Sequence, residues 1–244
     1  MAVNQLEQDG VYGAGLYGRL QRLVRLLLPP RCLLCAEPGQ ASLDLCPACL
    51  AALPLPGPAC TRCALPLPAP GTCGACQQRP PPLDSAHACL RYAPPADRLL
   101  PRFKFHQDLA AGRLLVQLMA RQRPPLPADA ILVPVPLHRS RLRQRGYDQA
   151  LELARPLARH LGLELRPDLL LRVRGTGAQS GLDAAARRRN LRHAFSARVP
   201  DPVPARVVLL DDVMTTGATL YAAARALRQA GVGEVHAWVC ARTP

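Results

Sequence analysis

The chain has 244 residues, enough for one α/β domain with a small additional module. Hydrophobic residues make up 49% of it, so a sizeable core is expected. Aromatic residues make up only 4%, which argues against a base-stacking platform for single-stranded nucleic acid. The net charge of +14 resides almost wholly in residues 89–244, which hold 25 basic and 12 acidic residues. A polyphosphate ligand and a nucleic-acid backbone are both compatible with this basic half.

Residues 1–30 predict a short basic amphipathic helix that ends at Pro29-Pro30. Apolar residues recur at helical spacing at Leu16, Leu20, Leu23, Val24 and Leu27. We favour packing of this helix on its own protein, and peripheral contact with an anionic membrane is the alternative. The acidic Glu7 and Asp9 and the short apolar run at 26–28 predict neither a secretory signal nor a transmembrane segment. We therefore expect a cytoplasmic protein with reduced cysteines.

Residues 31–79 contain four Cys-x-x-Cys pairs in a stretch otherwise rich in Pro, Gly and Ala. The pairs are Cys32/Cys35, Cys46/Cys49, Cys60/Cys63 and Cys73/Cys76. Two pairs complete a closed tetrahedral Cys₄ site, so the pattern predicts two structural zinc ions. Because the stretch has little other core, we expect it to unfold alone when metal is removed. Disulfides and rubredoxin-like iron are the rival interpretations. Pairing of neighbouring motifs is favoured over interleaved pairing because it closes shorter loops.

A proline-rich linker over residues 80–87 is expected to lead into a larger domain, residues 88–244. A strand is predicted at 88–92 and a helix at 109–121. Between them lies Lys104, the only lysine in a chain with thirty arginines. Either this position needs a compact ammonium group in place of a guanidinium, or the lysine occurs here by chance. The isolated Cys89 and Cys240 fit buried small hydrophobic residues better than reactive thiols.

A second strand, at 130–135, precedes a basic loop at 136–147. The loop holds one histidine and four arginines, His138, Arg139, Arg141, Arg143 and Arg145. If the strand end faces a ligand crevice, these cations suit a pyrophosphate; a merely solvated loop is the alternative. A helix is expected at 151–161.

A third strand, at 169–173, precedes a glycine-rich stretch at 174–181 and a basic run at 187–191. A mobile basic flap over a reacting diphosphate would exclude water and stabilise the leaving group. A disordered loop or one that contacts RNA fits these residues nearly as well.

The most specific motif lies at 207–219, where an apolar strand is followed by two acids and a Thr-Thr-Gly-Ala-Thr turn. Ligands of α/β sheets bind at the carboxyl ends of strands, and the N-terminus of the helix expected at 220–230 suits a phosphate. Asp211 and Asp212 would repel a phosphate but suit a sugar diol or an adjacent metal. The motif therefore predicts a phosphorylated sugar. A last strand is expected at 234–240, and no nucleotide P-loop pattern occurs.

This motif resembles the signature of type I phosphoribosyltransferases, which bind phosphoribosyl pyrophosphate (PRPP). From Cys32 onward the chain is similar to the ComF family, competence-associated phosphoribosyltransferase-like proteins also typified by GntX. That family has zinc Cys-x-x-Cys motifs, then a lysine segment matched by Lys104 and a Val-Pro-Val-Pro-Leu-His stretch matched at 133–138. Its Arg-Gly-Phe-Asn-Gln motif is matched at 145–149, with Tyr147 for Phe and Asp148 for Asn, which leaves the role of Asp148 open. Its flap residues are matched by Gln179, Arg187 and Asn190.

The resemblance implies a type I phosphoribosyltransferase fold, a mostly parallel sheet flanked by helices, with a small zinc-ribbon module before it. It implies PRPP bound with Mg²⁺, with Asp211 and Asp212 on the ribose hydroxyls. The 5′-phosphate would lie on Thr215, Thr216, Gly217, Ala218 and Thr219, and the pyrophosphate would face Lys104, His138, Arg139 and Arg145.

Membership would imply a role in DNA uptake during natural competence, with single-stranded DNA and competence or recombination proteins as candidate partners. The reaction would displace pyrophosphate from PRPP with a nitrogen nucleophile. No catalytic base or acceptor can be identified from the residues. A non-catalytic PRPP or nucleotide sensor and a single-stranded nucleic-acid-binding adaptor therefore remain alternatives.

Overall fold

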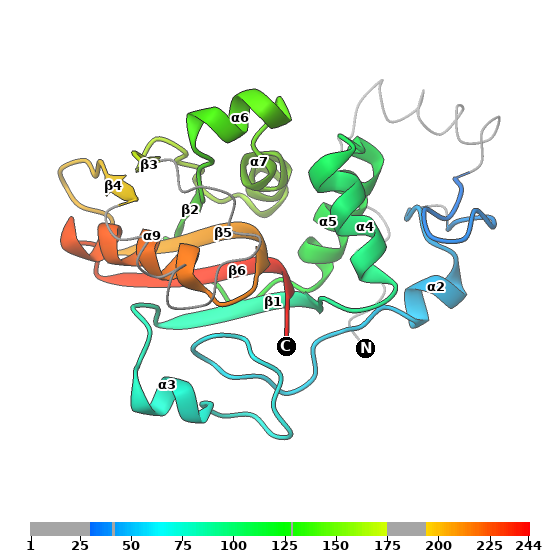
Figure 1. The fold of residues 1–244 in the computed structure, drawn as a ribbon, viewed down its shortest axis with the longest axis horizontal. Coiled ribbons are helices and arrows are strands. Elements are labelled where there is room, and N and C mark those ends of the chain that lie inside the picture. Colours follow the sequence, from blue (N-terminus) through cyan, green and yellow to red (C-terminus); the bar gives the residue numbers. More distant parts are fainter. Residues whose placement is uncertain (1–29, 41, 128, 175–193) are drawn as a thin grey trace.

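The computed structural model describes residues 30–40, 42–127, 129–174 and 194–244, and its centre is a four-stranded sheet (Figure 1). The strands follow the order β1-β6-β5-β2, and every neighbouring pair is parallel. Their bounds are Ser85–Arg91 for β1, Ile131–Pro134 for β2, Arg206–Met214 for β5 and Glu234–Arg242 for β6. This parallel sheet, flanked by helices, confirms the predicted α/β fold class.

The inner strands β5 and β6 are apolar because both faces of a parallel sheet are covered. Every residue from Val207 to Leu210 and from Ala237 to Ala241 is buried. In the observed register, Leu209 lies opposite Val133 on β2 and Ala237 on β6. The strands predicted at 88–92, 130–135 and 234–240 are confirmed, with ends that differ from the prediction by at most three residues.

Three helices cover one face of the sheet: α4 (Ala96–Phe105), α5 (Leu109–Arg121) and α7 (Gln149–Leu161). Helix α5 has its predicted bounds. Helix α7 begins two residues before its predicted start because the Asp148 side chain caps it, accepting a hydrogen bond from the backbone N–H of Leu151 at 3.1 Å. The sequence analysis did not predict α4, whose interior contains Pro101.

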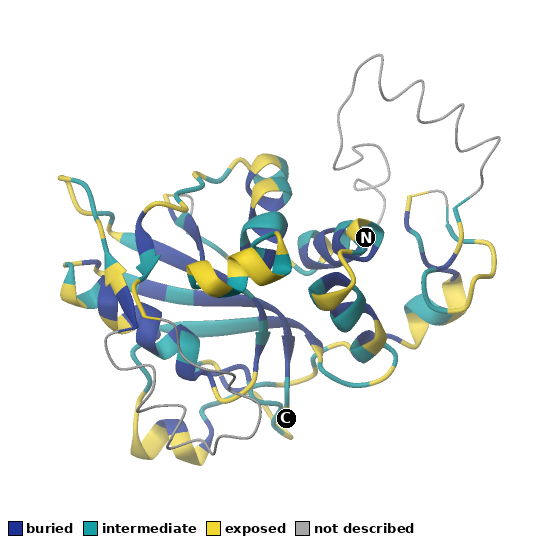
Figure 2. Cartoon of the chain, turned by 45° about the horizontal axis from the view of Figure 1, so that its top comes forward, coloured by how far each residue is buried: buried dark blue, intermediate teal, exposed yellow. Residues whose placement is uncertain are grey.

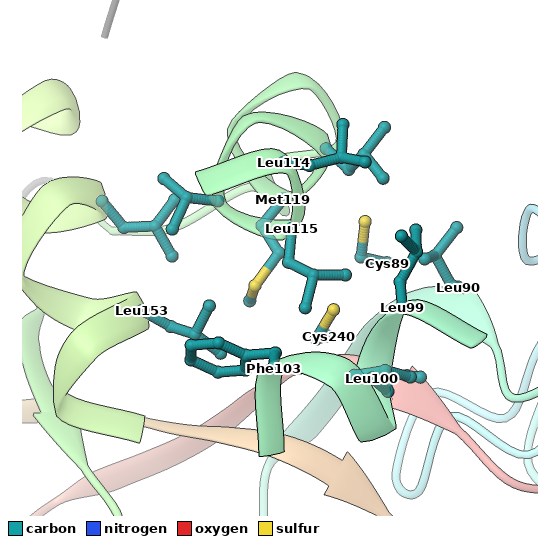
Figure 3. Packing of buried hydrophobic residues seen from close by; sticks show 14 of the residues in the cluster. Cys89, Leu90, Leu99, Leu100, Phe103, Leu114, Leu115, Met119, Leu153 and Cys240 are labelled. Carbon is teal, nitrogen blue, oxygen red and sulfur yellow. The ribbon is translucent and has the colours of Figure 1, made fainter. Parts of the chain in front are cut away.

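Cys89 of β1 and Cys240 of β6 lie in the core between this helix layer and the sheet (Figure 3). Both have no exposed surface. Burial raises the pKa of the Cys89 thiol to about 12, so this group stays protonated at neutral pH. Their interpretation as buried small hydrophobic residues is therefore confirmed.

The other face of the sheet is covered by α9 (Ala218–Gln229) and by an antiparallel pair of short strands, β3 (Leu170–Arg172) and β4 (Phe195–Ala197). The predicted third strand thus exists, but it belongs to a separate two-stranded sheet. Figure 2 shows buried residues concentrated in the main sheet and on the helix sides that face it.

The cysteine-rich segment forms two ribbons, and each packs on a different part of the main fold. The first ribbon includes α2 (Pro47–Ala51) and buries Leu43 and Leu45 in the cluster formed with α4 and α5. The second includes α3 (Gly74–Gln78) and belongs to the cluster that holds α9. Figure 1 shows α2 beside the α4/α5 layer and α3 below the sheet.

The chain enters the main fold within the expected linker, residues 80–87. Leu83 is fully buried, and β1 begins at Ser85. Arg62 of the second ribbon donates a hydrogen bond to the carbonyl oxygen of Leu83 at 2.9 Å. The ribbons are therefore packed onto the sheet and its helices through shared buried residues.

Two predicted segments lie outside the described residues: the amphipathic helix expected at 1–30, apart from its last residue, and the flap with Gln179, Arg187 and Asn190. Within the described ranges, no helix combines the length and hydropathy needed to cross a bilayer.

Candidate functional site

A cleft of about 520 Å³ lies at the carboxyl ends of β2 and β5. Helix α4, the segment after β2, the short helix α6 (Arg139–Arg145), the start of α7, strand β3 and the turn after β5 all contribute to its lining. Six of the predicted site residues line it: Lys104, Arg145, Asp211, Asp212, Thr215 and Thr219. The fold thus brings together groups more than a hundred positions apart in the sequence.

The two acids are part of strand β5, which continues through them to Met214. Because side chains alternate along a strand, Asp212 extends the row of Val208 and Leu210 toward the α4 face, and Asp211 points to the other side. Asp212 Oδ2 lies 2.7 Å from Lys104 Nζ. The acids therefore differ in surroundings, although the sequence analysis placed both after the strand.

Their different surroundings affect protonation. The pKa of Asp211 is raised to about 8, first because the carboxyl is withdrawn from water and second because the negative Asp212 lies next to it. Lys104 opposes this rise, as does the backbone N–H of Asp212, which donates to Asp211 Oδ1 at 2.9 Å. At neutral pH the pair can therefore offer a hydrogen-bond donor as well as acceptors.

The turn after the acids has the geometry of an anion site. Gly217 has a φ of 74°, in the left-handed region, and it precedes the first residue of the twelve-residue α9. A Cβ at Gly217 would lie 2.6 Å from Met214 Cε and from Tyr221 Cζ, so only glycine fits. Thr215 and Thr216 are exposed at the start of α9, and the backbone N–H groups of a helix N-terminus suit a phosphate. Thr216 Oγ1 accepts a hydrogen bond from the Ala218 N–H at 3.4 Å.

The basic segment after β2 forms helix α6 and not the predicted loop. Arg141 and Arg145, one helical turn apart, line the cleft. His138 and Arg139 are not among the lining residues: His138 Nδ1 caps α6 by accepting from the Ser140 N–H at 3.3 Å, and Arg139 is exposed. The cations that reach the cleft from this segment are thus on one face of the helix.

The role that the sequence left open for Asp148 is structural at least in part. Its Oδ2 accepts a hydrogen bond from the Leu137 N–H at 2.9 Å, and its Oδ1 caps α7. This carboxylate therefore ties the segment after β2 to α7, both of which line the cleft.

Arg172 is a cleft residue that was not predicted from the sequence, whereas Arg141 belongs to the basic segment that was expected to face a pyrophosphate. Arg172 comes from β3, and its guanidinium lies 5.4 Å from the Phe195 ring centroid. The available signal was a charged residue inside the apolar run at 169–173.

Arg145, which was predicted, is held in place by its own neighbours. Its guanidinium donates to Gln149 Oε1 at 2.9 Å and lies 5.4 Å from the ring centroid of Phe105. Residues from both faces of the sheet thus meet in the cleft.

The eight cysteines of the ribbons form two clusters, each with its four sulfur atoms within 4.8 Å of one another. The first holds Cys32, Cys35, Cys46 and Cys49, and the second holds Cys60, Cys63, Cys73 and Cys76. Pairing of neighbouring motifs is therefore confirmed. Each cluster is a four-sulfur set of the kind that holds a structural zinc ion.

Backbone N–H groups make these sulfurs suitable metal ligands. The N–H of Cys49 donates to Cys46 Sγ at 3.4 Å, and that of Cys73 donates to Cys60 Sγ at 3.3 Å. Burial raises the pKa of Cys32 and Cys60, but backbone donors outweigh it and lower the values to about 6 and about 7. Hydrogen bonds from the neighbouring cysteine sulfurs raise the pKa of Cys49 to about 12, so without metal each cluster combines thiolates with protonated thiols. Thiolates are the form that binds zinc.

Comparison with known proteins gives matches to two domain models. The double zinc ribbon domain model matches residues 23–77, and the phosphoribosyl transferase domain model matches residues 148–244. The DNA utilization protein YhgH of Salmonella typhi is 37% identical over 226 residues, covering 89% of this chain and 99% of the relative. Competence protein F of Haemophilus influenzae is 37% identical over 178 residues, covering 70% of this chain and 78% of the relative. The chain belongs to the ComF family.

A further relative is the DNA utilization protein YhgH of Escherichia coli (strain K12). It is 35% identical over 231 residues, which cover 89% of this chain and 99% of the relative. Among solved structures, the Bacillus subtilis glutamine PRPP amidotransferase complexed with ADP and GMP matches 52% of this chain and 26% of its own length. Its TM-score of 0.34 and identity of 23% are too low to bear on function.

The two domain matches leave out part of the ComF cleft. The phosphoribosyl transferase match includes the acids and the turn, but it begins at Asp148, after Lys104 and α6. The spatial arrangement alone brings these cations to the acids. The double zinc ribbon match spans both cysteine clusters, which supports zinc as their metal.

Proposed function

We propose that this ComF-family protein binds PRPP in the cleft and transfers its phosphoribosyl group, releasing pyrophosphate, in support of DNA uptake. The observation that carries the proposal is the meeting of three groups in one cleft. These are the acids at the end of β5, the adjoining Thr215–Thr219 turn, and Lys104, whose Nζ lies 2.7 Å from Asp212. A phosphorylated sugar diol needs this combination of an anion site beside carboxylates.

In the proposed complex, the turn residues Thr215, Thr216, Gly217, Ala218 and Thr219 bind the 5′-phosphate. Asp211 and Asp212 bind the two ribose hydroxyls. Asp212 accepts from one hydroxyl, and Asp211, which keeps a proton near neutral pH, can also donate. Lys104 is then shared between Asp212 and the diphosphate.

The pyrophosphate end is proposed to lie among Lys104, Arg141 and Arg145. In the reaction a nitrogen nucleophile bonds to the anomeric carbon as the carbon–oxygen bond to pyrophosphate breaks, and the electron pair leaves with pyrophosphate. These cations stabilise the charge that develops on that leaving group. Mg²⁺ would neutralise more of the negative charge of the diphosphate. Carboxylate oxygens such as those of Asp211 and Asp212 are ligands that suit Mg²⁺.

The wider assignment is also part of the proposal. We propose a cytoplasmic protein in four segments: the basic helix at 1–30, the double zinc ribbon at 31–79, the linker at 80–87 and the phosphoribosyltransferase-like domain at 88–244. The flap residues Gln179, Arg187 and Asn190 would cover the bound diphosphate.

A second candidate function, a single-stranded nucleic-acid adaptor of the competence or recombination machinery, is favoured by the excess of basic residues in 89–244. Relatives whose names refer to DNA utilization and competence support it further. Its test is the salt dependence of single-stranded DNA affinity, which should fall steeply as salt rises because released counterions drive such binding. Affinity independent of salt would count against it.

The enzymatic proposal is tested by pyrophosphate release. The zinc-loaded protein is incubated with PRPP and Mg²⁺ and screened against free nucleobases, ammonia and single-stranded DNA. Release that requires one acceptor class, and is lost in D211N/D212N, is expected. PRPP binding without release from any acceptor would instead identify a sensor, and absence of PRPP binding would reject the phosphoribosyl assignment altogether.

A further inference from the structure

The second Cys₄ cluster lies directly behind the turn that is proposed to bind phosphate. Its four cysteines belong to the same buried hydrophobic cluster as Met214, which precedes the turn, and Ala218, which is part of it. Tyr221, one helical turn into α9, packs against the same buried hydrophobic cluster and against Gly217. The first Cys₄ cluster has no such position, because its ribbon packs on α4 and α5.

Arg242, the last residue of β6, links the second cluster to the turn by hydrogen bonds. It is 7% exposed. Its Nε donates to the carbonyl oxygen of Cys63, a cluster cysteine, at 2.9 Å, and its NH1 donates to the carbonyl oxygen of Met214 at 3.2 Å. A third hydrogen bond joins it to the carbonyl oxygen of Thr243. One guanidinium thus bridges the metal-binding ribbon and the end of β5.

The orientation of the Met214 carbonyl determines how the turn begins. It also accepts a hydrogen bond from the Thr243 N–H at 3.1 Å, so it is held from two directions. The peptide bond that contains this carbonyl is planar, and its other end is the N–H of Thr215. Fixing the carbonyl therefore fixes the direction of the Thr215 N–H, and Thr215 lines the cleft.

A buried guanidinium at a strand end is costly to desolvate, and an apolar side chain would fill the same space more simply. The fork of an arginine, however, can hold two carbonyls in a fixed relative position. The three described acceptors of Arg242 are all backbone carbonyl oxygens, as a positioning role requires.

We propose that Arg242 is a positioning residue that couples the second Cys₄ site to the phosphate turn. Ordering of the ribbon by metal would fix the Cys63 carbonyl, and Arg242 would pass this constraint to Met214 and so to the turn. Because coupling is reciprocal, a sugar phosphate on the turn should also tighten metal binding at the second site. This inference rests on the proposed binding of a phosphorylated sugar in the cleft.

The first test compares R242K with R113K in the full chain. Lysine keeps the charge of Arg242 but not the two-point fork. Arg113 is a matched control, because it ties the first ribbon to α5 through Asp44 at 2.6 Å and α5 contributes nothing to the cleft lining. Zinc content and thermal unfolding establish that each variant is loaded and folded. Ribose 5-phosphate and inorganic pyrophosphate are then titrated separately by calorimetry.

We expect R242K to weaken ribose 5-phosphate binding about three- to tenfold, as for one lost hydrogen bond, and to leave pyrophosphate binding unchanged. R113K should change neither. A general structural defect would weaken both ligands together and would overturn the proposal, as would unchanged ribose 5-phosphate binding in R242K. If the unmodified protein binds neither ribose 5-phosphate nor PRPP, the proposed function fails, and this inference fails with it.

The second test uses the unmodified protein and so does not depend on the folding of R242K. Zinc release to a chelator is followed with and without saturating ribose 5-phosphate. The sugar phosphate should slow the release of one of the two zinc ions and leave the other unchanged. Equal release of both ions with and without the ligand, in protein that binds the ligand, would overturn the coupling.

Discussion

Asp211 and Asp212 are adjacent in the chain but lie on opposite sides of strand β5, and this separates their chemistry. Asp212 is paired with Lys104 at 2.7 Å, whereas the pKa of Asp211 is raised to about 8 by its withdrawal from water and by Asp212. Near neutral pH the Asp211 carboxyl is therefore largely protonated. Its protonation limits the repulsion between this pair and the phosphates of PRPP.

This asymmetry predicts unequal effects of single substitutions at pH 7. D211N replaces a mostly protonated carboxyl with a neutral amide, so PRPP affinity should fall by less than about threefold. D212N removes a charge-assisted hydrogen bond to the ribose and leaves Lys104 without its partner, so affinity should fall about tenfold or more. Calorimetric titration of both variants checks the order. A larger loss in D211N would contradict the assigned protonation states.

The protonation of Asp211 also predicts a pH dependence of stability. Between the ordinary aspartate pKa near 4 and the folded value of about 8, the folded protein holds a proton that the unfolded chain has released. The free energy of unfolding should therefore fall as pH rises through this window and level off above it. Comparing pH 6 with pH 9, the melting temperature of the parent protein should fall more than that of D211N. Parallel curves would show that Asp211 does not hold this proton.

At the scale of elements, helix α6 places some of its arginines at the cleft and others in solvent. His138 caps its start, and Gly146, with a φ of 80°, ends it. Arg141 and Arg145 lie four residues apart and line the cleft, whereas the intervening Arg143 is exposed and is not among the lining residues. Only part of the charge in this segment is therefore available to a bound diphosphate.

Helix α6 offers a matched pair of substitutions. R141A should weaken inorganic pyrophosphate binding about tenfold, the order of one charge-assisted hydrogen bond, because Arg141 lines the cleft. R143A removes the same charge from an exposed position and should change the affinity less than twofold. The measurement is a titration of each variant with pyrophosphate at fixed ionic strength. Equal losses would indicate a general effect of charge and not a local site.

The elements that sequence analysis predicted well are those with local signals. The motif at 207–219 and the four cysteine pairs carry their geometry in consecutive residues, and neighbouring pairs do form the two clusters. Lys104 was noticed for its rarity and assigned to the pyrophosphate by the family resemblance, but its contact with Asp212 depends on the packing of the unpredicted α4 on the sheet. The position of Arg172 depends on a two-stranded sheet whose partner strand β4 begins more than twenty residues later. Such contacts are set by tertiary packing, which local patterns do not encode.

At the scale of the whole molecule, each zinc ribbon shares a buried core with the main fold. The first contributes Leu43, Leu45 and Leu53 to the core around α4 and α5, and the second shares the core that surrounds α9. This differs from the independent module that the cysteine-rich sequence suggests. Loss of metal should therefore expose apolar surface in the main domain as well as in the ribbons.

Chelation should accordingly destabilise the whole chain and not residues 32–76 alone. Trp238, the only tryptophan, is fully buried in the centre of the sheet and reports on the main core by its fluorescence. Removal of both zinc ions should lower the temperature of the Trp238 transition together with the loss of ribbon structure. An unchanged Trp238 transition after verified loss of zinc would show that the ribbons fold as a separate unit.

The central claim, that the acids hold the sugar of PRPP while the turn holds its phosphate, is tested most directly by one calorimetric comparison. The parent protein and D211N/D212N are titrated with PRPP and Mg²⁺, and separately with inorganic phosphate. The double variant should lose roughly tenfold to a hundredfold in PRPP affinity, because two hydrogen bonds to the ribose are weakened. It should bind inorganic phosphate equally well or better, because a repulsive charge has gone. Equal PRPP affinity in two folded proteins would contradict the claim.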